Sequence, residues 1–137
     1  MQREEIIDAY REYIACLNAQ DWSNLQRHVA DNVEYNGRTI GFDGYRDMLV
    51  EDFRAIPDLS FNIAFLVCDP PMIASRLSFD CTPMGQLFGM PVNKKRVRFA
   101  ENVFYEFRNG RIRIVWSVID KASVAAQISN YAGQYGL

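Results

Sequence analysis

The hydrophobic pattern of this chain changes at Pro57, and this change restricts the available folds more than any other feature. Before Pro57, apolar residues recur at steps of three and four, as on one helix face: Ile7, Tyr10, Ile14 and Leu17, then Tyr45, Leu49, Phe53 and Ile56. After Pro57 the period falls to about two, which predicts strands over 59–68, 72–82 and 96–116, the last folded on itself. Helices followed by strands are typical of an α+β fold, with helices on one side of a largely antiparallel sheet.

Shorter elements complete the predicted order. The pattern indicates a second helix, a weak strand and a final amphipathic helix at 22–29, 33–35 and 121–131. Asp21 and Asp43 are suitable N-caps for the second and third helices. The segment 83–95 is the longest irregular connection, and we expect it to form a rim or lid over a cleft.

The composition is that of an ordinary globular domain. Of 137 residues, 49% are hydrophobic and 23% are charged, so residues 1–137 can form one domain with a sizeable core. The net charge of −2 gives no basic surface for nucleic acids or anionic membranes. No run of about 18 apolar residues occurs, and no signal segment follows the charged N-terminus. We expect a cytoplasmic protein with no nucleic-acid and no membrane partner.

The inventory of reactive side chains limits the chemistry. His28 is the only histidine, so a His-rich zinc site is excluded and a Ser/His or Cys/His nucleophile would need this one residue. Three cysteines without C-x-x-C spacing lie in apolar runs, which favours free thiols in a reducing compartment. The glycines at 85–89 lack the strand and helix context of a phosphate loop. We therefore expect neither a metal ion nor an organic cofactor.

The pair Asn109-Gly110 between two alternating strands is the strongest short hairpin signal in the chain. A two-residue loop at this pair sets a register in which one face carries four pairs: Phe107 with Ile112, Tyr105 with Ile114, Val103 with Trp116, and Glu101 with Val118. Asp120 extends that face. The opposite face carries several arginines with Asn102 and Glu106, and we expect it to be solvated or part of a subunit contact.

This register makes Glu101 and Asp120 diagonal neighbours, roughly 7–8 Å apart by Cα, at the end of an apolar surface. Burial and mutual repulsion would raise the pKa of each carboxyl group, which suits a general acid or base near neutral pH. The pair is the predicted catalytic site. In the alternative, Asp120 caps the last helix and Glu101 pairs with Arg76 or another cation.

The remaining predicted site residues are substrate-binding. Asp80 and Arg76 share the polar face of one strand, which is either solvated or turned inward toward a substrate. Aromatic residues of the hairpin and its neighbours would be core or pocket wall. The predicted substrate-binding set is Asp80, Arg76, Phe99, Tyr105, Trp116 and Tyr35. Acids in the helices, such as Asp8, Asp47, Glu51 and Asp52, are interpreted as solvated.

Five segments together resemble the SnoaL-like polyketide cyclase (ester cyclase) family, over residues 4–130: GFDGY at 41–45, IPDLSF at 56–61, the glycine segment 85–91, FYEFRNGRI at 104–112 and WSVID at 116–120. The resemblance implies the nuclear-transport-factor-two-like, cystatin-like fold. That fold is a cone-shaped, curved antiparallel sheet covered by three N-terminal helices around an apolar cavity, often dimeric through the sheet.

The resemblance also implies cyclisation of a polyketide by an aldol reaction without a cofactor, with Asp120 at the position of the acid/base aspartate. Many relatives carry Gly-Thr-His before the irregular loop, whereas this chain has Cys81-Thr82-Pro83 and lacks that histidine. The predicted function is a cofactor-independent acid/base enzyme on a small hydrophobic carbonyl compound, acting as a homodimer by cyclisation, isomerisation or dehydration. The alternative is a non-catalytic module that binds a small apolar ligand or mediates association.

Overall fold

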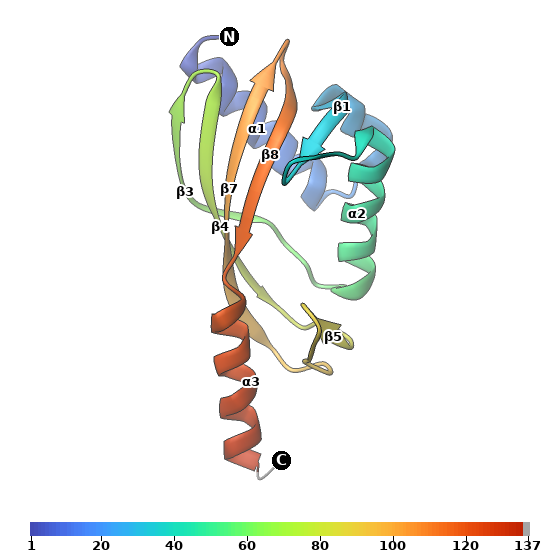
Figure 1. The fold of residues 1–137 in the computed structure, drawn as a ribbon, viewed down its shortest axis with the longest axis vertical. Coiled ribbons are helices and arrows are strands. Elements are labelled where there is room, and N and C mark those ends of the chain that lie inside the picture. The colour runs from blue at the N-terminus through green and yellow to red at the C-terminus, as the bar shows by residue number, and fades with distance from the viewer. Residues whose placement is uncertain (136–137) are drawn as a thin grey trace.

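The computed structural model describes residues 1–135, with side chains described through residue 131. The helices are α1 (Arg3–Asn18), the 3₁₀ helix η1 (Trp22–Arg27), α2 (Gly41–Ala55) and α3 (Lys121–Tyr135). The strands are β1 (Val29–Tyr35), β2 (Arg38–Thr39), β3 (Asn62–Asp69), β4 (Met72–Cys81), β5 (Gln86–Leu87), β6 (Met90–Pro91), β7 (Val97–Arg108) and β8 (Arg111–Ile119). This order confirms the α+β prediction, with three helical segments before the long strands (Figure 1).

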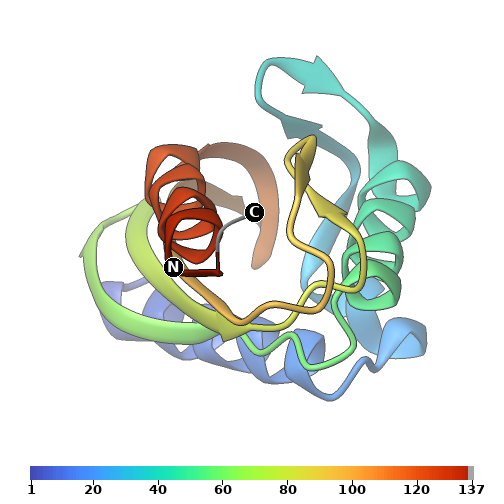
Figure 2. The ribbon, with the colours of Figure 1, turned by 90° about the horizontal axis from the view of Figure 1, so that it is seen from below.

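Six strands form one curved sheet in the order β2-β1-β8-β7-β4-β3. Neighbouring strands are antiparallel except β1 and β8, which run parallel. Figure 2 shows the sheet as an open arc that α1, α2 and the β5–β6 hairpin complete on the inside. The sheet does not close into a barrel, so the space inside the arc is bounded by strands on one side and helices on the other.

The β7–β8 hairpin turns at the predicted residues but then departs from the predicted register. Asn109 and Gly110 have φ of 52° and 79°, as the two central positions of a type I′ turn require. Phe107 pairs with Ile112 as predicted, but Glu106 pairs with Ile114, so Arg113 is an extra residue in a β-bulge. The parallel pairing of β1 with β8 is irregular over the same stretch.

The bulge reverses the faces of β8 beyond it. Tyr105 pairs with Val115 and Glu101 with Ile119, one position away from the predicted partners. The predicted register is therefore wrong past the bulge, because a slip of one residue moves every following side chain to the other face. Val115, Ser117 and Ile119 turn inward, whereas Trp116 and Val118 are exposed on the outer face.

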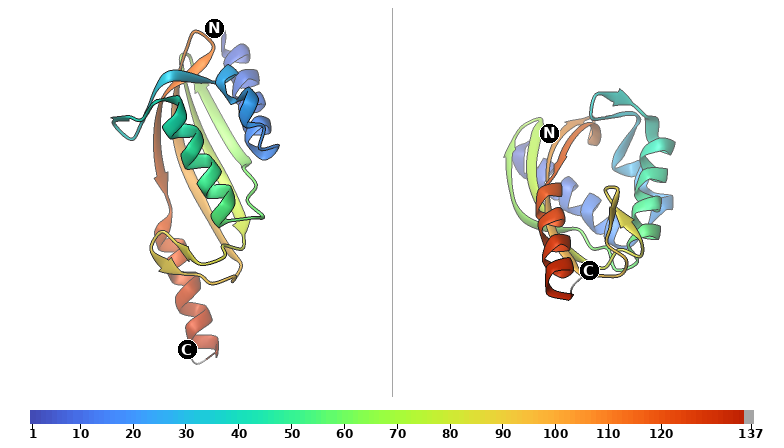
Figure 3. Two further views of the ribbon diagram at one scale, coloured as in Figure 1. Left: turned by 90° about the vertical axis from the view of Figure 1, so that its right-hand side faces the viewer. Right: turned by 60° about the horizontal axis from the view of Figure 1, so that its bottom comes forward.

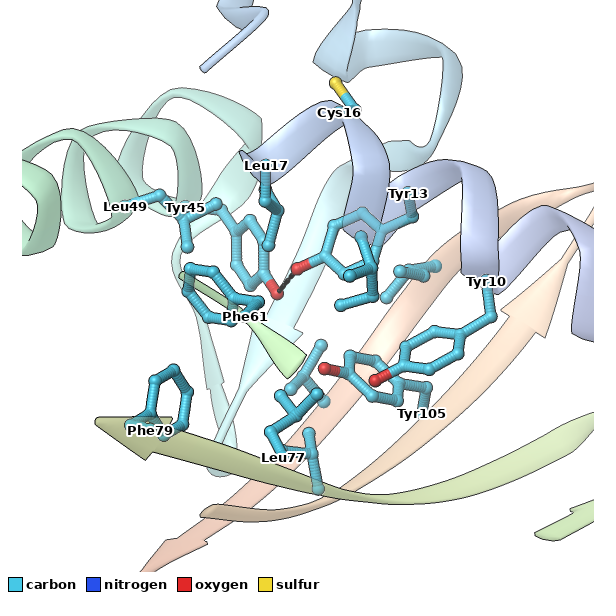
Figure 4. Close-up of a cluster of buried hydrophobic side chains, with 14 of the residues drawn as sticks. Tyr10, Tyr13, Cys16, Leu17, Tyr45, Leu49, Phe61, Leu77, Phe79 and Tyr105 are labelled. Carbon is cyan, nitrogen blue, oxygen red and sulfur yellow. Dashed lines mark hydrogen bonds between the residues drawn. The ribbon is translucent and has the colours of Figure 1, made fainter. Parts of the chain in front are cut away.

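The helical stripes predicted from the sequence form much of the core. Tyr10, Ile14 and Leu17 of α1 are buried, although Ile6 rather than Ile7 takes the first core position. The stripe of α2 is likewise buried against the inner face of the sheet. Figure 4 shows how tyrosines from both helices and from β7 converge there with Phe61, just before β3, and Phe79 of β4.

The last helix extends beyond the sheet. Figures 1 and 3 show α3 continuing from the end of β8 away from the helices that cover the arc. Val124 is fully buried and anchors its first turns against the core, and Gln127 bonds to the backbone of Arg98 in β7. Within residues 1–135, no helix combines the length and the apolar character needed to span a membrane.

Candidate active site

A cavity of about 160 Å³ lies between the inner face of the sheet, α2 and the β5–β6 hairpin. Its volume is close to that of an engineered cavity of about 150 Å³ that binds benzene, so a compact ring compound fits it. Aliphatic and phenylalanine side chains form most of the wall, and Leu87 and Phe88 of the 83–95 segment contribute to it. This segment therefore borders the cavity, in agreement with its predicted place at a rim.

The polar part of the cavity consists of tyrosines and two acids. Tyr13, Tyr35, Tyr45 and Tyr105 line it together with Glu101 and Asp52. None of the described residues that line it is a lysine, arginine or histidine. Two carboxyl groups therefore face an apolar cavity that holds no cationic side chain to neutralise them.

Glu101 projects inward from the middle of β7, between the buried residues Phe99 and Val103. Ser117 Oγ donates a hydrogen bond to Glu101 Oε2. Ser117 faces Glu101 only because the bulge turns it inward. Burial raises the pKa of Glu101 above its usual range, and the bond from Ser117 counteracts only part of that rise.

Asp52 is the second acid. It lies on α2, at a position where the sequence predicts a solvated side chain. It follows Tyr45 and Leu49 by seven and three positions, so it lies at the edge of the buried stripe of α2. The residue is exposed, and its carboxyl group lines the cavity. The pKa of Asp52 rises to about 7, first because the cavity wall removes water from the carboxyl group, then because Glu101 and Glu51 are negatively charged.

The raised pKa of Asp52 makes stability depend on pH. The folded state holds this proton up to about pH 7, whereas the reference pKa is 3.8, so between these values the folded state binds more protons. The free energy of unfolding should therefore fall as pH rises from about 4 to 7 and stay level above. Asp52→Asn should remove this part of the fall in urea denaturation across pH. Asp47→Asn, on the exposed face of the same helix, should keep it, and equal profiles for both variants would contradict the assignment.

Asp120 lies outside the cavity lining. Its backbone N–H donates to the carbonyl of Ala100 at 2.9 Å, and its carboxylate accepts a bond from the N–H of Ser123 at 3.2 Å. It is exposed and caps α3, which is the alternative that the sequence left open. The prediction that it shares an apolar face with Glu101 is wrong, because the bulge shifts β8 by one residue.

Three of the predicted substrate-binding residues also lie on the outer face. Trp116 is 48% exposed there, again because of the bulge. Arg76 Nη1 donates to Asn102 Oδ1 at 3.0 Å, and Asp80 forms ion pairs with Arg96 and Arg98. The inner face of β4 holds apolar residues and the small Ser75, so its charged side chains turn outward. The other three, Phe99, Tyr105 and Tyr35, line the cavity.

The remaining reactive side chains do not gather at the cavity. In residues 1–135, no three His, Cys, Asp or Glu side chains are grouped in a way that could hold a metal ion. Cys16 and Cys81 are buried free thiols, and Cys68 is a half-buried one.

An arc-shaped sheet with helices on its concave side and an apolar cavity between them defines the nuclear-transport-factor-two-like class of α+β proteins. This chain belongs to the SnoaL-like polyketide cyclase family, whose sequence pattern matches residues 7–128. The fold and the family expected from the sequence are therefore confirmed. None of the curated proteins compared with the chain matches it.

Solved structures agree with this assignment. A SnoaL-like polyketide cyclase from Agrobacterium tumefaciens is 49% identical, with a TM-score of 0.90 over 93% of this chain and 99% of that one. TsrD from Streptomyces laurentii is 18% identical, with a TM-score of 0.81 over 93% of this chain and 96% of that one. IdmH from Streptomyces antibioticus is 17% identical, with a TM-score of 0.77 over 89% and 96%. The last two share the fold.

Proposed function

We propose that the protein is a cofactor-independent acid/base enzyme that removes a proton next to the carbonyl group of a compact hydrophobic compound. Cyclisation, isomerisation and dehydration share this step, and family membership favours a reaction of the polyketide cyclase type. The observation that carries the proposal is the placement of two carboxyl groups, Glu101 and Asp52, in an apolar cavity without a cation.

The two carboxyl groups can take different roles because one can be ionised while the other is protonated. Burial raises the pKa of both, and the charge of Glu101 raises that of Asp52 further, to about 7, so near neutral pH Asp52 can hold a proton while Glu101 is charged. The ionised member accepts the substrate proton. The protonated member donates a hydrogen bond to the oxygen of the developing enolate.

The family resemblance would instead place the acid/base role on Asp120. In the structure Asp120 holds the first turn of α3, and Glu101 and Asp52 take the positions inside the cavity. The proposal therefore assigns proton transfer to the latter two. Asp120→Asn tests this choice directly.

A second candidate is a non-catalytic carrier of a small apolar ligand. Pro83 stands where many relatives carry a histidine, which favours this candidate. Both candidates use the same cavity, and they differ in whether the bound compound is deprotonated.

Deuterium exchange separates the two candidates. Acetophenone is a single-ring ketone suited to the cavity volume, and exchange of its methyl protons in D₂O is followed by NMR. An enzyme should accelerate the exchange, and heat-inactivated protein should not. Binding without accelerated exchange would favour the carrier and contradict the enzyme.

The outer face of the sheet supports a second proposal, that the protein is a homodimer through this face. Val67, Ala74, Phe104 and Trp116 pair laterally across β3, β4, β7 and β8, and we call them the outer apolar row. Three of the four are between 48% and 61% exposed, and the neighbouring Phe65 and Val118 exceed 60%. A contiguous apolar surface of this kind marks an association site, and family resemblance favours a second copy as the occupant.

Charges around the outer apolar row suit a two-fold contact. Arg76 lies beside it in β4, and Glu106 flanks it on the other side in β7. A two-fold axis through the row would bring Arg76 of one protomer toward Glu106 of the other, since each face carries both signs.

A further inference from the structure

Three buried tyrosine hydroxyls belong to the same cavity as the two carboxyl groups. Tyr13, Tyr45 and Tyr105 are 1%, 3% and 3% exposed, and all three line the cavity. Burial raises the pKa of each well above its usual range, so each keeps its proton at any physiological pH. The cavity thus contains neutral hydrogen-bond donors as well as acids.

Two of these hydroxyls form a bonded pair. Tyr13 of α1 and Tyr45 of α2 approach to 2.7 Å between their oxygens, as Figure 4 shows. Either oxygen can be the donor, and each hydroxyl carries one proton. Whichever hydroxyl accepts this bond keeps its own proton available to a further acceptor, and a hydroxyl that already accepts a bond is a stronger donor.

The carboxyl group of Glu101 lies within electrostatic reach of all three hydroxyls. Its charge contributes to the raised pKa of Tyr13, Tyr45 and Tyr105. Its hydrogen bond, however, comes from Ser117 on β8. The tyrosine hydroxyls and the carboxyl group thus line one cavity without bonding to each other in the described part of the chain.

We propose that the bonded pair Tyr13 and Tyr45, together with Tyr105, forms a subsite for the carbonyl oxygen of a neutral ketone or similar compound. A ketone oxygen only accepts hydrogen bonds, which matches hydroxyl donors, and its α-carbon would lie toward the carboxyl groups. A carboxylate ligand of the same size is disfavoured, because the cavity lining holds two acids and no cation. This inference deepens the proposed function by naming the group recognised, and it rests on that function for its catalytic meaning.

The test is binding, measured by ¹⁹F NMR at pH 8.5, where Asp52 is largely ionised. The probes are 4-fluoroacetophenone, its isostere 4-fluoro-α-methylstyrene, in which C=CH₂ replaces C=O, and 4-fluorobenzoate. Wild-type protein should prefer the ketone over the isostere about fivefold, the value of one hydrogen bond of about 1 kcal/mol. It should bind the benzoate weakest of the three.

Phenylalanine variants assign the preference to particular hydroxyls. The double variant Tyr13→Phe/Tyr45→Phe should abolish it and Tyr105→Phe should reduce it, while both leave the affinity for the isostere unchanged, which shows that the cavity is intact. Tyr131→Phe is the matched control, because it removes the same hydroxyl from a tyrosine that bonds to the backbone of Arg96 and does not line the cavity. It should keep the full preference.

Several results would overturn the subsite: no preference for the ketone in wild type, a preference that survives both Tyr13→Phe/Tyr45→Phe and Tyr105→Phe, tight binding of the benzoate, or binding of none of the probes. Failure of the enzyme proposal would give a different pattern of results. If the ketone preference depends on the tyrosine hydroxyls but no deuterium exchange occurs, the subsite is supported and the enzyme proposal is refuted. If exchange depends on Glu101 but not on the tyrosine hydroxyls, the enzyme proposal is supported and the subsite is refuted.

Discussion

Glu101→Gln is expected to lower the rate of deuterium exchange into bound acetophenone by about 100-fold or more, the usual contribution of a general acid/base group. The amide keeps the size of the side chain and can still bond to Ser117, but it can neither accept the substrate proton nor share one with Asp52. Asp52→Asn should cause a loss of the same order. In wild type the rate should follow a bell-shaped pH profile, since one member of the pair must be ionised and the other protonated.

Matched substitutions keep this test specific. Glu106→Gln is the same change on the same strand but on the outer face, and Asp47→Asn is the same change as Asp52→Asn on the same helix. Both controls should retain the wild-type rate. Full activity in Glu101→Gln and Asp52→Asn would refute the proposed pair. If Asp120→Asn is inactive and Asp52→Asn is active, the proton-transfer role belongs to Asp120 instead.

Phe104→Asp is expected to raise the dissociation constant of the dimer at least about 100-fold, because it places a charge at the centre of a buried apolar contact. Around a two-fold axis both copies of the new carboxylate lie in the same interface, so repulsion adds to the cost of desolvation. Sedimentation analysis over a range of micromolar concentrations would measure the shift. The wild-type protein should sediment as a dimer and the variant as a monomer.

Met84→Asp serves as the control for this prediction. Met84 is another large apolar side chain, 47% exposed, but it lies in the 83–95 segment rather than on the outer apolar row. Its replacement should leave the dimer intact. A wild-type monomer at about 100 μM, or an unchanged dimer in Phe104→Asp, would contradict association through the sheet.

The helices and strands could be predicted well because their signals are local. The α1 and α2 stripes follow from apolar spacing alone, and the β7–β8 turn follows from Asn109-Gly110, two residues that tolerate positive φ. The candidate site could be predicted only in part. Glu101, Phe99 and Tyr105 precede the turn on β7, where strict alternation continues, and the structure places all three in the cavity.

Past the turn, the regular alternation of inward and outward side chains along β8 is broken at one residue. Nothing in the local sequence distinguishes a regular β8 from one with a bulge at Arg113, and the irregular pairing with β1 occurs at the same place. That one residue sends Trp116 to the outer apolar row, gives Asp120 to the cap of α3 and brings Ser117 to Glu101. The spacing that could have indicated Asp52, three positions after Leu49, was present in the sequence, but acids at the edge of a stripe are usually solvated.

The sequence by itself thus determined the class of fold, the apolar character of its interior and the inward position of Glu101, because periodicity and turn chemistry act between near neighbours. Only the tertiary structure decided which second acid joins Glu101 in the cavity lining and which tyrosines line the cavity with them. Those contacts join α1, α2, β7 and β8 across the arc of the sheet. They depend on how the elements pack and on a bulge that coincides with irregular pairing to β1, and no local pattern along one element carries that information.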